Sequence, residues 1–442
     1  MNRHLYVRHA YVFVPVLILW FCGGTLMGSD LPEPWADPFV SSVATIPSSD
    51  TLSLADVLAL VGRANGTLIA GRHTGQAAEA RAEQAGRRPN PELALEAEQL
   101  GWDAPGFSEA EVSIGISQDF DLWGARDAER RAAGREVELE TLAVRQNAFD
   151  LYLETKARFL DVAYAQQGYG LRLHSEQLLA DLVESIRIRV DKGATMSVEL
   201  RLAELERARA ETESRTAAAD FRAMQFRLVS LWQEAGEKLP VLRINTERPS
   251  LPELTTLTTL LESSRDVVLW RADEAHLDAQ AEAARLAARP TLNLGGGMKR
   301  NEADNNNTFM LSASLPLPFF NRNRGTVMAL RRQQEAARAE RLQALADARA
   351  ELQAVHGHLT QLNENLARLD GVMLPAAEAA FGDLSDAYRA GRVPYTMLLE
   401  SQRTLLDLER ERNDLYLAMH RDIMALERLF GIPLIDNHNG ER

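Results

Sequence analysis

Four short stretches of the chain alternate apolar and polar residues with a period of two. They form two pairs, and in each pair a polar stretch separates the two members. The first pair covers residues 91–99 and 111–118, and the second covers 291–295 and 308–315. Such alternation is typical of strands with one buried and one wet face. We predict two β-hairpins, with loops at 101–110 and 299–307.

Most of the remaining chain has the composition of α-helix. Residues 51–84 form the first predicted helix, with its apolar residues on one face, and Pro89 and Pro91 are expected to stop it. Two stretches of about 65 residues, 125–189 and 325–389, follow the two hairpins. At ~1.5 Å per residue, each of these stretches predicts a rod of roughly 100 Å.

Each rod leads to a glycine and then to a second long helix. The glycines are Gly193 and Gly391, and the second helices are predicted at 197–233 and 395–430. Helices of this length are typical of coiled-coil packing. Pro375 is expected to kink or break the second rod, because proline cannot donate the helical hydrogen bond.

The whole order of elements occurs twice, about 200 residues apart. Arg88-Pro89 is matched by Arg289-Pro290, and the segment from Ser117 to Trp123 is matched by that from Ser314 to Phe320. A tandem duplication of a mixed helix–strand unit explains this periodicity. We therefore divide the chain into a first structural repeat (52–238), a linker (239–252), a second structural repeat (253–433) and a polar tail (434–442).

The N-terminus is typical of a secretory signal peptide, predicted at residues 1–28. Arg3 and Arg8 precede an apolar run from Ala10 to Phe21, which is shorter than the ~20 residues of a membrane-spanning helix. A retained anchor is therefore the less favoured alternative. Lipidation of Cys22 is a third, although the bulky Phe21 precedes it. Residues 29–51, rich in proline and serine, predict an extended arm.

Charge and cysteine content exclude several classes of function. The net charge is −14 and no cluster of lysine and arginine suits phosphate binding, so nucleic acid is not an expected partner. Cys22 is the only cysteine, which excludes disulfides and cysteine-based metal sites. Motifs for nucleotide binding, zinc proteases and serine hydrolases are absent, so we expect no enzyme and no cofactor.

Four short strands cannot close a membrane barrel, because even small barrels need about eight strands. Three copies of the chain would supply twelve strands around a water-filled bore, and strands of this length can cross a tilted bilayer. The alternative is a pair of soluble flaps against a core. The predicted bore-facing residues are Glu96, Glu98, Ser113, Asn293 and Ser312, and the predicted lipid-facing residues are Leu93, Leu95, Val112, Ile114, Leu292, Phe309 and Leu311. Trp123, Phe319 and Phe320 are predicted interfacial aromatics.

The segment from Leu315 to Gly325, with the sequence LPLPFFNRNRG, resembles the strand-to-helix junction of a known family. The chain is similar to the TolC-type outer-membrane efflux proteins, and in this segment to their heavy-metal (cobalt–zinc–cadmium, CzcC-like) branch. The resemblance covers about residues 52–432. Pro316 and Pro318 would end strand pairing, Asn321 would cap the helix that enters at Gly325, and the first repeat has Asp119 and Asp121 in place of the prolines.

The two glycine turns also resemble the periplasmic helical tips of this family. The resemblance implies that Gly193 and Gly391, with neighbouring Lys192 and Arg389, turn the rods and contact an adaptor protein. It also implies a tip gate containing Tyr388, Glu199, Glu400 and Arg392. A second acid of the family's constriction ring falls on Met397 and an arginine on Val393, so the ring departs from the family pattern.

These observations predict a mostly α-helical fold with a small β part. As a homotrimer it would form a 12-stranded outer-membrane β-barrel continued by a periplasmic α-helical barrel. The implied function is passive conduction of heavy-metal cations in a tripartite efflux system, with a periplasmic adaptor, an inner-membrane resistance–nodulation–division (RND) pump and outer-membrane lipid as partners. A coiled-coil envelope scaffold without a pore is the main alternative, and an envelope enzyme is a remote one.

Overall fold

The computed structural model describes residues 51–99, 110–232, 240–244, 253–302 and 304–434, which belong to one compact unit. The predicted signal peptide, Cys22 and nearly all of the predicted arm lie outside the described residues. So do most of the 101–110 loop, parts of the linker and most of the tail.

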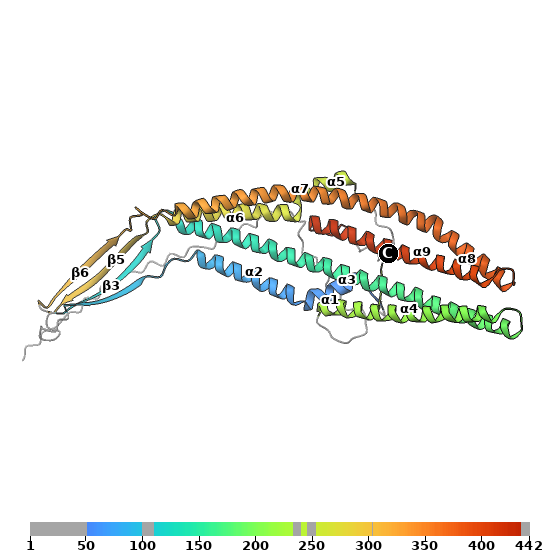
Figure 1. The fold of residues 1–442 in the computed structure, drawn as a ribbon. Helices are drawn as coiled ribbons and strands as arrows, with labels where there is room; N and C mark the ends of the chain where they lie inside the picture. The colour runs from blue at the N-terminus through green and yellow to red at the C-terminus, as the bar shows by residue number, and fades with distance from the viewer. Residues whose placement is uncertain (1–50, 100–109, 233–239, 245–252, 303, 435–442) are drawn as a thin grey trace, which may run out of the picture. The chain divides into compact units, whose positions relative to one another are not determined.

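Two similar series of elements follow one another along the chain (Figure 1). The first consists of α1 (Leu54–Ala64), α2 (Gly66–Ala85), β2 (Glu92–Glu98), β3 (Glu111–Phe120), α3 (Ala125–Asp191) and α4 (Ser197–Val229). The second consists of α5 (Leu254–Thr259), α6 (Arg265–Ala287), β5 (Leu292–Asn301), β6 (Asn306–Ser314), α7 (Arg324–Arg368), α8 (Leu374–Arg389) and α9 (Tyr395–Phe430).

The prediction of one helix over residues 51–84 is wrong. The structure has α1 and α2, bent by 51° where they meet at Asn65. The Asn65 side chain accepts a hydrogen bond from the Thr67 N–H (2.8 Å) and donates one to the Leu231 carbonyl (2.8 Å). Asparagine is a strong N-cap, and it starts a second helix here. Among the described residues no single helix is long and apolar enough to span a membrane, and only the bent α1–α2 pair passes that test.

The predicted linker takes part in a small sheet that the periodicity does not reveal. β4 (Val241–Leu242) pairs in parallel with β1 (Thr51–Leu52). The Arg243 N–H donates to the Leu52 carbonyl at 2.9 Å, and the Gln166 side chain of α3 accepts from the Leu242 N–H at 3.0 Å. The linker is therefore tied to the start of the first series and to α3.

The four alternating segments form one antiparallel sheet in the order β2-β3-β5-β6. The two predicted hairpins are confirmed, and β3 and β5 join them. The second loop is shorter than predicted, because β5 continues to Asn301 and β6 begins at Asn306. Within the chain, the described parts of β2 and β6 each pair on one side only.

Residues directly opposite in neighbouring strands share a face of the sheet. One row across the four strands is apolar: Leu95, Ile114, Met298 and Phe309. The next row along is polar: Glu96, Ser113, Lys299 and Thr308. The separation into an apolar and a polar face is therefore as predicted.

Glycines allow β3 and β5 to approach closely. Gly115 pairs with Gly297, and a Cβ atom on Gly297 would lie 2.5 Å from the Ile114 carbonyl oxygen and 2.9 Å from the Gly115 Cα. Neither contact is sterically possible without movement of the backbone. The contact between the two hairpins therefore requires glycine at this position.

The helices pack as a coiled coil around a common core. In α7 and the turn after it, the buried leucines Leu352, Leu359, Leu362, Leu366 and Leu369 follow the alternating three- and four-residue spacing of a heptad repeat. The first four of them pack with residues of α1, α3, α4 and α9 into one cluster. The rod predicted at 325–389 is continuous, but Leu369–Met373 forms a π-helical turn that ends two residues before Pro375. Pro375 therefore perturbs the hydrogen-bonding pattern without ending the helix.

A buried ion pair connects α3 with α9 inside this core. Lys156 Nζ lies 2.8 Å from both carboxylate oxygens of Glu427, and the two side chains are 3% and 0% exposed. The Leu434 N–H also donates to Glu427 (3.2 Å). Removing one partner from such a pair typically costs ~3–5 kcal/mol, because the other charge is left buried.

Candidate functional site

The two helical turns have the same backbone geometry. Gly193 (φ 68°) follows α3 and Gly391 (φ 72°) follows α8, both in the left-handed region. The Ala194 N–H donates to the Arg189 carbonyl at 2.8 Å, and the Arg392 N–H donates to the Ala387 carbonyl at 2.9 Å. Both are the six-to-one bonds of a Schellman motif. The expectation that these glycines turn the rods is thus confirmed, and each left-handed glycine reverses a helix onto its successor.

A small apolar core joins the two turns. We call it the tip cluster, and it consists of Val183, Ile186, Ala203, Tyr388, Tyr395 and Leu398. Its members come from α3 and α4 of the first series and from α8 and α9 of the second. The cluster therefore holds together two helical hairpins that are about 200 residues apart in sequence.

Arg189 is a charged residue that contacts the other hairpin at this point. Its guanidinium carbon lies 5.0 Å from the centroid of the Tyr388 ring, and its Nη1 donates to the Tyr388 carbonyl at 3.4 Å. A guanidinium over an aromatic face is attracted by the negative face of the ring. Sequence reasoning places Arg189 in the turn motif without a role, because its contact is with a residue of the other series.

Two tyrosine hydroxyl groups in the tip cluster lack hydrogen-bond partners within the described part of the chain. Tyr388 and Tyr395 are 4% and 2% exposed, and their rings meet edge to face with centroids 6.4 Å apart. Burial raises the pKa of the Tyr388 hydroxyl; Arg189 opposes this rise and Glu199 adds to it. Burial and Glu206 raise the pKa of Tyr395 to about 12. Both hydroxyls stay protonated near neutral pH, and a buried donor without an acceptor costs about 1–3 kcal/mol.

The structure brings together only some of the predicted gate residues. Tyr388 is buried in the tip cluster, and Glu199 lies near enough to affect its pKa while accepting from the Thr195 hydroxyl at 2.6 Å. Glu400 and Arg392 are exposed, and no ion pair joins either to the other predicted gate residues within the described part of the chain. They lie near the turn but outside the cluster.

The predicted adaptor-contacting residues lie on the surface of the turns. Lys192, Gly193, Arg389 and Gly391 are exposed. Arg389 forms a loose ion pair with Asp386 on its own helix (3.6 Å), and both side chains are more than three-quarters exposed. This surface is open to a partner in the single chain.

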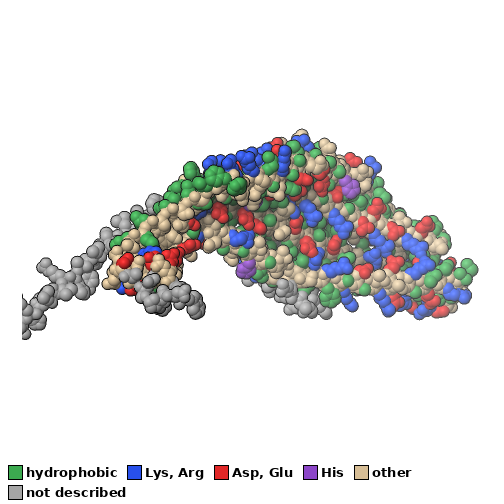
Figure 2. All heavy atoms as spheres, turned by 60° about the vertical axis from the view of Figure 1, so that its left-hand side comes forward, with side chains coloured by type: hydrophobic (Ala, Val, Ile, Leu, Met, Phe, Trp, Pro, Cys, Tyr) green, Lys and Arg blue, Asp and Glu red, His purple; other side chains and the backbone are tan. Residues whose placement is uncertain are grey.

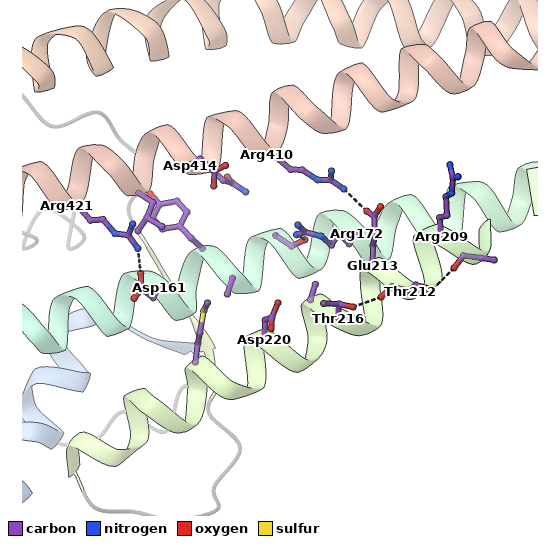
Figure 3. A pocket seen from close by; sticks show the side chains of 18 of the residues that line it. Asp161, Arg172, Arg209, Thr212, Glu213, Thr216, Asp220, Arg410, Asp414 and Arg421 are labelled. Atoms are coloured by element: carbon purple, nitrogen blue, oxygen red, sulfur yellow. Dashed lines mark hydrogen bonds and ion pairs between the residues drawn. The ribbon is translucent and has the colours of Figure 1, made fainter. Parts of the chain in front are cut away.

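Beyond the turns, a groove of about 950 Å³ lies between α3, α4 and α9 (Figure 3). Ion pairs cross between the helices: Arg403 with Glu206 (2.5 Å), Arg410 with Glu213 (3.0 Å) and Arg421 with Asp161 (3.1 Å). The first two pairs repeat after seven residues in both α4 and α9, as expected for helices in coiled-coil register. They add polar links between the two series along the groove.

The two strand-to-helix junctions differ in their capping. At the first, the Asp121 carboxylate accepts from the backbone N–H groups of Trp123, Gly124 and Arg126 at 2.8–3.0 Å. At the second, the prediction that Asn321 caps the helix is wrong. The N-cap is Asn323 (φ 51°), which makes no side-chain cap bond, while Asn321 accepts from the Asn323 N–H at 3.1 Å.

The remaining junction residues have simple positions. Pro316 and Pro318 lie between the end of β6 and the start of α7, and Gly325 is the second residue of α7. No atom outside its own helix lies within 4 Å of a Cβ built on Gly325, so close packing does not require glycine there.

The apolar face of the sheet is exposed in the single chain. Phe309 and Leu311 are 84% and 94% exposed, and Phe320, beyond the end of β6, is fully exposed. Figure 2 shows hydrophobic side chains gathered over the region of the strands. An apolar surface of this kind on a folded chain marks contact with lipid or with another protein.

A profile of the family described as "Outer membrane efflux protein" matches residues 62–232 and again residues 256–432. The chain belongs to this family. It is an efflux duct of the outer membrane that extends into the periplasm, and its family and fold are those of passive channels. The two matched segments correspond to the two series of elements described above.

Individual relatives and solved structures agree with this assignment. The cobalt-zinc-cadmium resistance protein CzcC of Cupriavidus metallidurans is 28% identical over 84% of this chain and 88% of its own. The pyoverdine export outer membrane protein OpmQ of Pseudomonas putida is 25% identical over 73% and 70%. The fold is similar to those of CusC (TM-score 0.72, 17% identity, 85% and 91% covered) and of VceC from Vibrio cholerae (0.69, 18%, 86% and 97%).

Within the described part of the chain, no group of three or more His, Asp or Glu side chains is arranged to hold a metal ion. Charged side chains are instead spread along the groove and over the polar face of the sheet. The arrangement can conduct and exclude solutes by charge, and its tip cluster can hold two hairpins together or release them.

Proposed function

We propose that three copies of this chain form a duct that carries heavy-metal cations out of the cell. The supporting observation is the β2-β3-β5-β6 sheet, which has one exposed apolar face and an unpaired side at each outer strand. If β6 of one copy pairs with β2 of the next, three sheets close into a 12-stranded barrel and no open edge faces lipid. The polar face, with Glu96, Glu98 and Ser113, then lines the bore.

We further propose that the tip cluster is the closed state of a gate. In this state Arg189 and Tyr388 link the two hairpins, and two tyrosine hydroxyls have no hydrogen-bond partner among the residues that the structure describes. Opening the cluster would let water form hydrogen bonds with these hydroxyls. This gain would offset part of the free-energy cost of exposing the apolar side chains. Glu199 acts beside Tyr388, and the exposed Glu400 and Arg392 act at the rim of the opening.

The partners that would open the gate are a periplasmic adaptor and an inner-membrane RND pump. The exposed turn residues Lys192, Gly193, Arg389 and Gly391 are the proposed adaptor contacts. A cysteine at position 192 or 389, combined with Cys22→Ser, should cross-link to a co-expressed adaptor in the periplasm. Cysteines at Arg207 and Arg222, which are exposed on α4 away from the turn, serve as controls. Equal cross-linking at all four positions would contradict the assignment.

The proposed cargo is a divalent metal cation. The support is the similarity to CzcC, and the relatives named for pyoverdine export make a siderophore the competing cargo. A deletion strain should lose tolerance to cobalt, zinc or cadmium and regain it with the intact gene. Loss of siderophore secretion with unchanged metal tolerance would favour the second cargo.

Conductance tests the duct itself. The detergent-purified protein should produce discrete, cation-selective openings in a planar lipid bilayer. Glu400→Ala should make the openings larger or less selective if this carboxylate acts at the rim. Unchanged openings would remove Glu400 from the gate and keep the duct. A protein that stays soluble without detergent and never conducts would support the scaffold alternative.

A further inference from the structure

Arginine is concentrated where the strands pass into the helices. Four segments make up this region: residues 85–91, 121–135, 285–290 and 315–333. Together they contain twelve arginines, no lysine and three acidic residues, in a chain whose net charge is −14. The region therefore has the opposite charge from the protein as a whole.

The strongest part of this concentration lies at the start of α7. Arg322, Arg324, Arg331 and Arg332 occur in the segment 315–333, which has no acidic residue. All four side chains are exposed. Arg332 pairs with Glu335 (2.6 Å), but Arg322, Arg324 and Arg331 have no carboxylate partner in the described part of the chain. We call these three residues the junction arginines.

Two of the junction arginines, Arg322 and Arg324, are placed where an isolated helix would disfavour them. The N-terminus of a helix carries a partial positive charge, so acidic residues are favoured there and cations are not. The first turn of α7 has no acid, and Asn323 forms no cap bond. The first junction is different, because the Asp121 carboxylate supplies the negative charge beside α3. The second junction, at residues 315–333, has four arginines and no acidic side chain.

The apolar surface that precedes these arginines contacts lipid in an outer-membrane protein. Phe319 and Phe320 are 68% and 102% exposed, and Trp123, at the equivalent place in the first repeat, is 50% exposed. Arg289 lies over the Trp123 ring at 5.6 Å from its centroid. Figure 2 shows a row of Lys and Arg side chains next to the hydrophobic ones on the same face of the molecule. Aromatic residues followed by arginine are typical of a membrane–water interface.

The junction arginines extend over somewhat more than the thickness of one headgroup layer. Arg324 and Arg331 are seven residues apart, so they lie on the same side of α7 and about 10 Å apart along its axis. The two headgroup layers together add about 10–15 Å to a hydrocarbon core of about 30 Å. One layer is therefore about 5–7 Å thick. With Phe319 and Phe320 at the interface, Arg322 and Arg324 lie at the level of the phosphates, and the long side chain of Arg331 can extend back towards them.

We propose that the junction arginines bind anionic phospholipid headgroups in the periplasmic leaflet of the outer membrane. The expected ligand is a lipid phosphate with a net negative charge, as in phosphatidylglycerol. Arginine forms charge-assisted bonds to two phosphate oxygens at once, and the phosphate supplies the anion that α7 lacks. Binding here fixes the depth of the duct in the membrane. The inference needs the outer-membrane location and is independent of the proposed gate and cargo.

Lipid retention by the full-length protein tests this proposal. The purified wild type is mixed with equal amounts of phosphatidylglycerol and phosphatidylcholine in detergent, and bound lipid is counted by native mass spectrometry. We expect phosphatidylglycerol to be preferred and the preference to fall with added salt. The triple variant R322Q/R324Q/R331Q should lower the preference roughly tenfold or more, because each arginine near a membrane surface contributes to binding of anionic lipid.

Matched variants separate this site from general charge effects. The triple variant R201Q/R207Q/R222Q removes the same amount of positive charge from three exposed arginines of α4. It should keep the preference for phosphatidylglycerol. R322K/R324K/R331K keeps the positive charge and should retain most of the preference for phosphatidylglycerol. If the triple glutamine variant does not fold, Arg324→Gln alone should still lower the preference measurably.

Three results would overturn the proposal. The first is equal retention of both lipids by the wild type, and the second is equal loss of preference in the α4 variant. The third is displacement of the lipid by millimolar inorganic phosphate, which would show that a free anion and not a membrane lipid is the ligand.

Discussion

At the scale of single residues, two contacts join the two halves of the chain. Arg189 and Tyr388 are 199 positions apart in sequence, yet the guanidinium lies 5.0 Å from the ring centroid. Lys156 and Glu427 form their buried pair across 271 positions. Each of these residues looks like an ordinary helical side chain in the sequence, and its role comes from its partner.

Arg189→Gln should make the duct open more often. The substitution removes a cation–π contact of about 0.5–1 kcal/mol, which corresponds to a two- to fivefold change in the open-to-closed ratio for each chain. Single-channel recordings measure this ratio. Arg389→Gln, which alters a loosely paired and exposed neighbour, is the control and should leave the ratio unchanged. Equal effects of both substitutions would remove Arg189 from the gate.

His420 should make stability depend on pH. Burial, with nearby Lys156, lowers the pKa of its imidazole to about 4, and its Nε2 has no partner within the described residues. The unfolded chain has a histidine pKa near 6.5, so it binds the proton more tightly than the folded protein does. The contribution of His420 therefore leaves the free energy of unfolding highest above about pH 6.5 and lowers it as the pH drops towards 4. Below pH 4 this group causes no further change.

His420→Leu should flatten this dependence, with an effect of about 3 kcal/mol between the two ends of the range. The measurement is the apparent unfolding midpoint in detergent across pH 4–7. His73→Leu, at an exposed position of α2, should keep the wild-type slope. A His420→Leu protein with an unchanged slope would show that other groups cause the acid sensitivity.

At the scale of elements, the sheet depends on the contact between its two hairpins. β3 and β5 meet over ten residue pairs, and Gly297 allows the closest approach. Its neighbour Gly296 is different, because a Cβ there would lie 3.7 Å from Leu311 Cδ2, which is an ordinary van der Waals distance. Adjacent glycines in one strand therefore have different steric requirements.

Gly297→Ala should disrupt the joining of the hairpins, whereas Gly296→Ala should be tolerated. The added methyl group at position 297 meets backbone atoms that cannot move aside, and strain of this type costs about 1–3 kcal/mol or more. Heat-modifiable migration of outer-membrane extracts measures the folded fraction. Similar folded fractions in the two variants would contradict the close packing of β3 and β5.

At the scale of the whole molecule, the chain is incomplete by itself. Its apolar sheet face is exposed, and its outer strands β2 and β6 have one unpaired side within the described residues. Symmetric association satisfies both outer strands at once when the rotation closes. The single chain is therefore best understood as one third of the proposed duct.

The detergent-purified protein should have the mass of three chains, each 49.1 kDa before any processing. Light scattering with correction for bound detergent measures this mass. Truncation of β6 should abolish the trimer, because it removes the outer strand that β2 of the next copy needs. A stable monomer in mild detergent that still conducts would contradict the proposed assembly.

The sequence by itself determined the kinds of element and their order. Period-two alternation predicted the strands and their two faces, and the resemblance of the glycine segments to the family's helical tips predicted the turns at Gly193 and Gly391. These features are local, because strand periodicity and positive φ angles are properties of a few neighbouring residues. The family resemblance rested on equally local motifs at the junction and the turns.

Only the tertiary structure decided how distant parts of the chain meet. It joined the hairpins through β3 and β5, paired β1 with β4, placed Arg189 over Tyr388, and gave capping roles to Asp121 and Asn65 that the sequence analysis did not assign. The wrong predictions, a single helix over 51–84 and a cap at Asn321, have the same origin. Many asparagines and aspartates can cap a helix, and the surrounding packing selects which of them does so, because a cap needs the right backbone geometry as well as the right side chain.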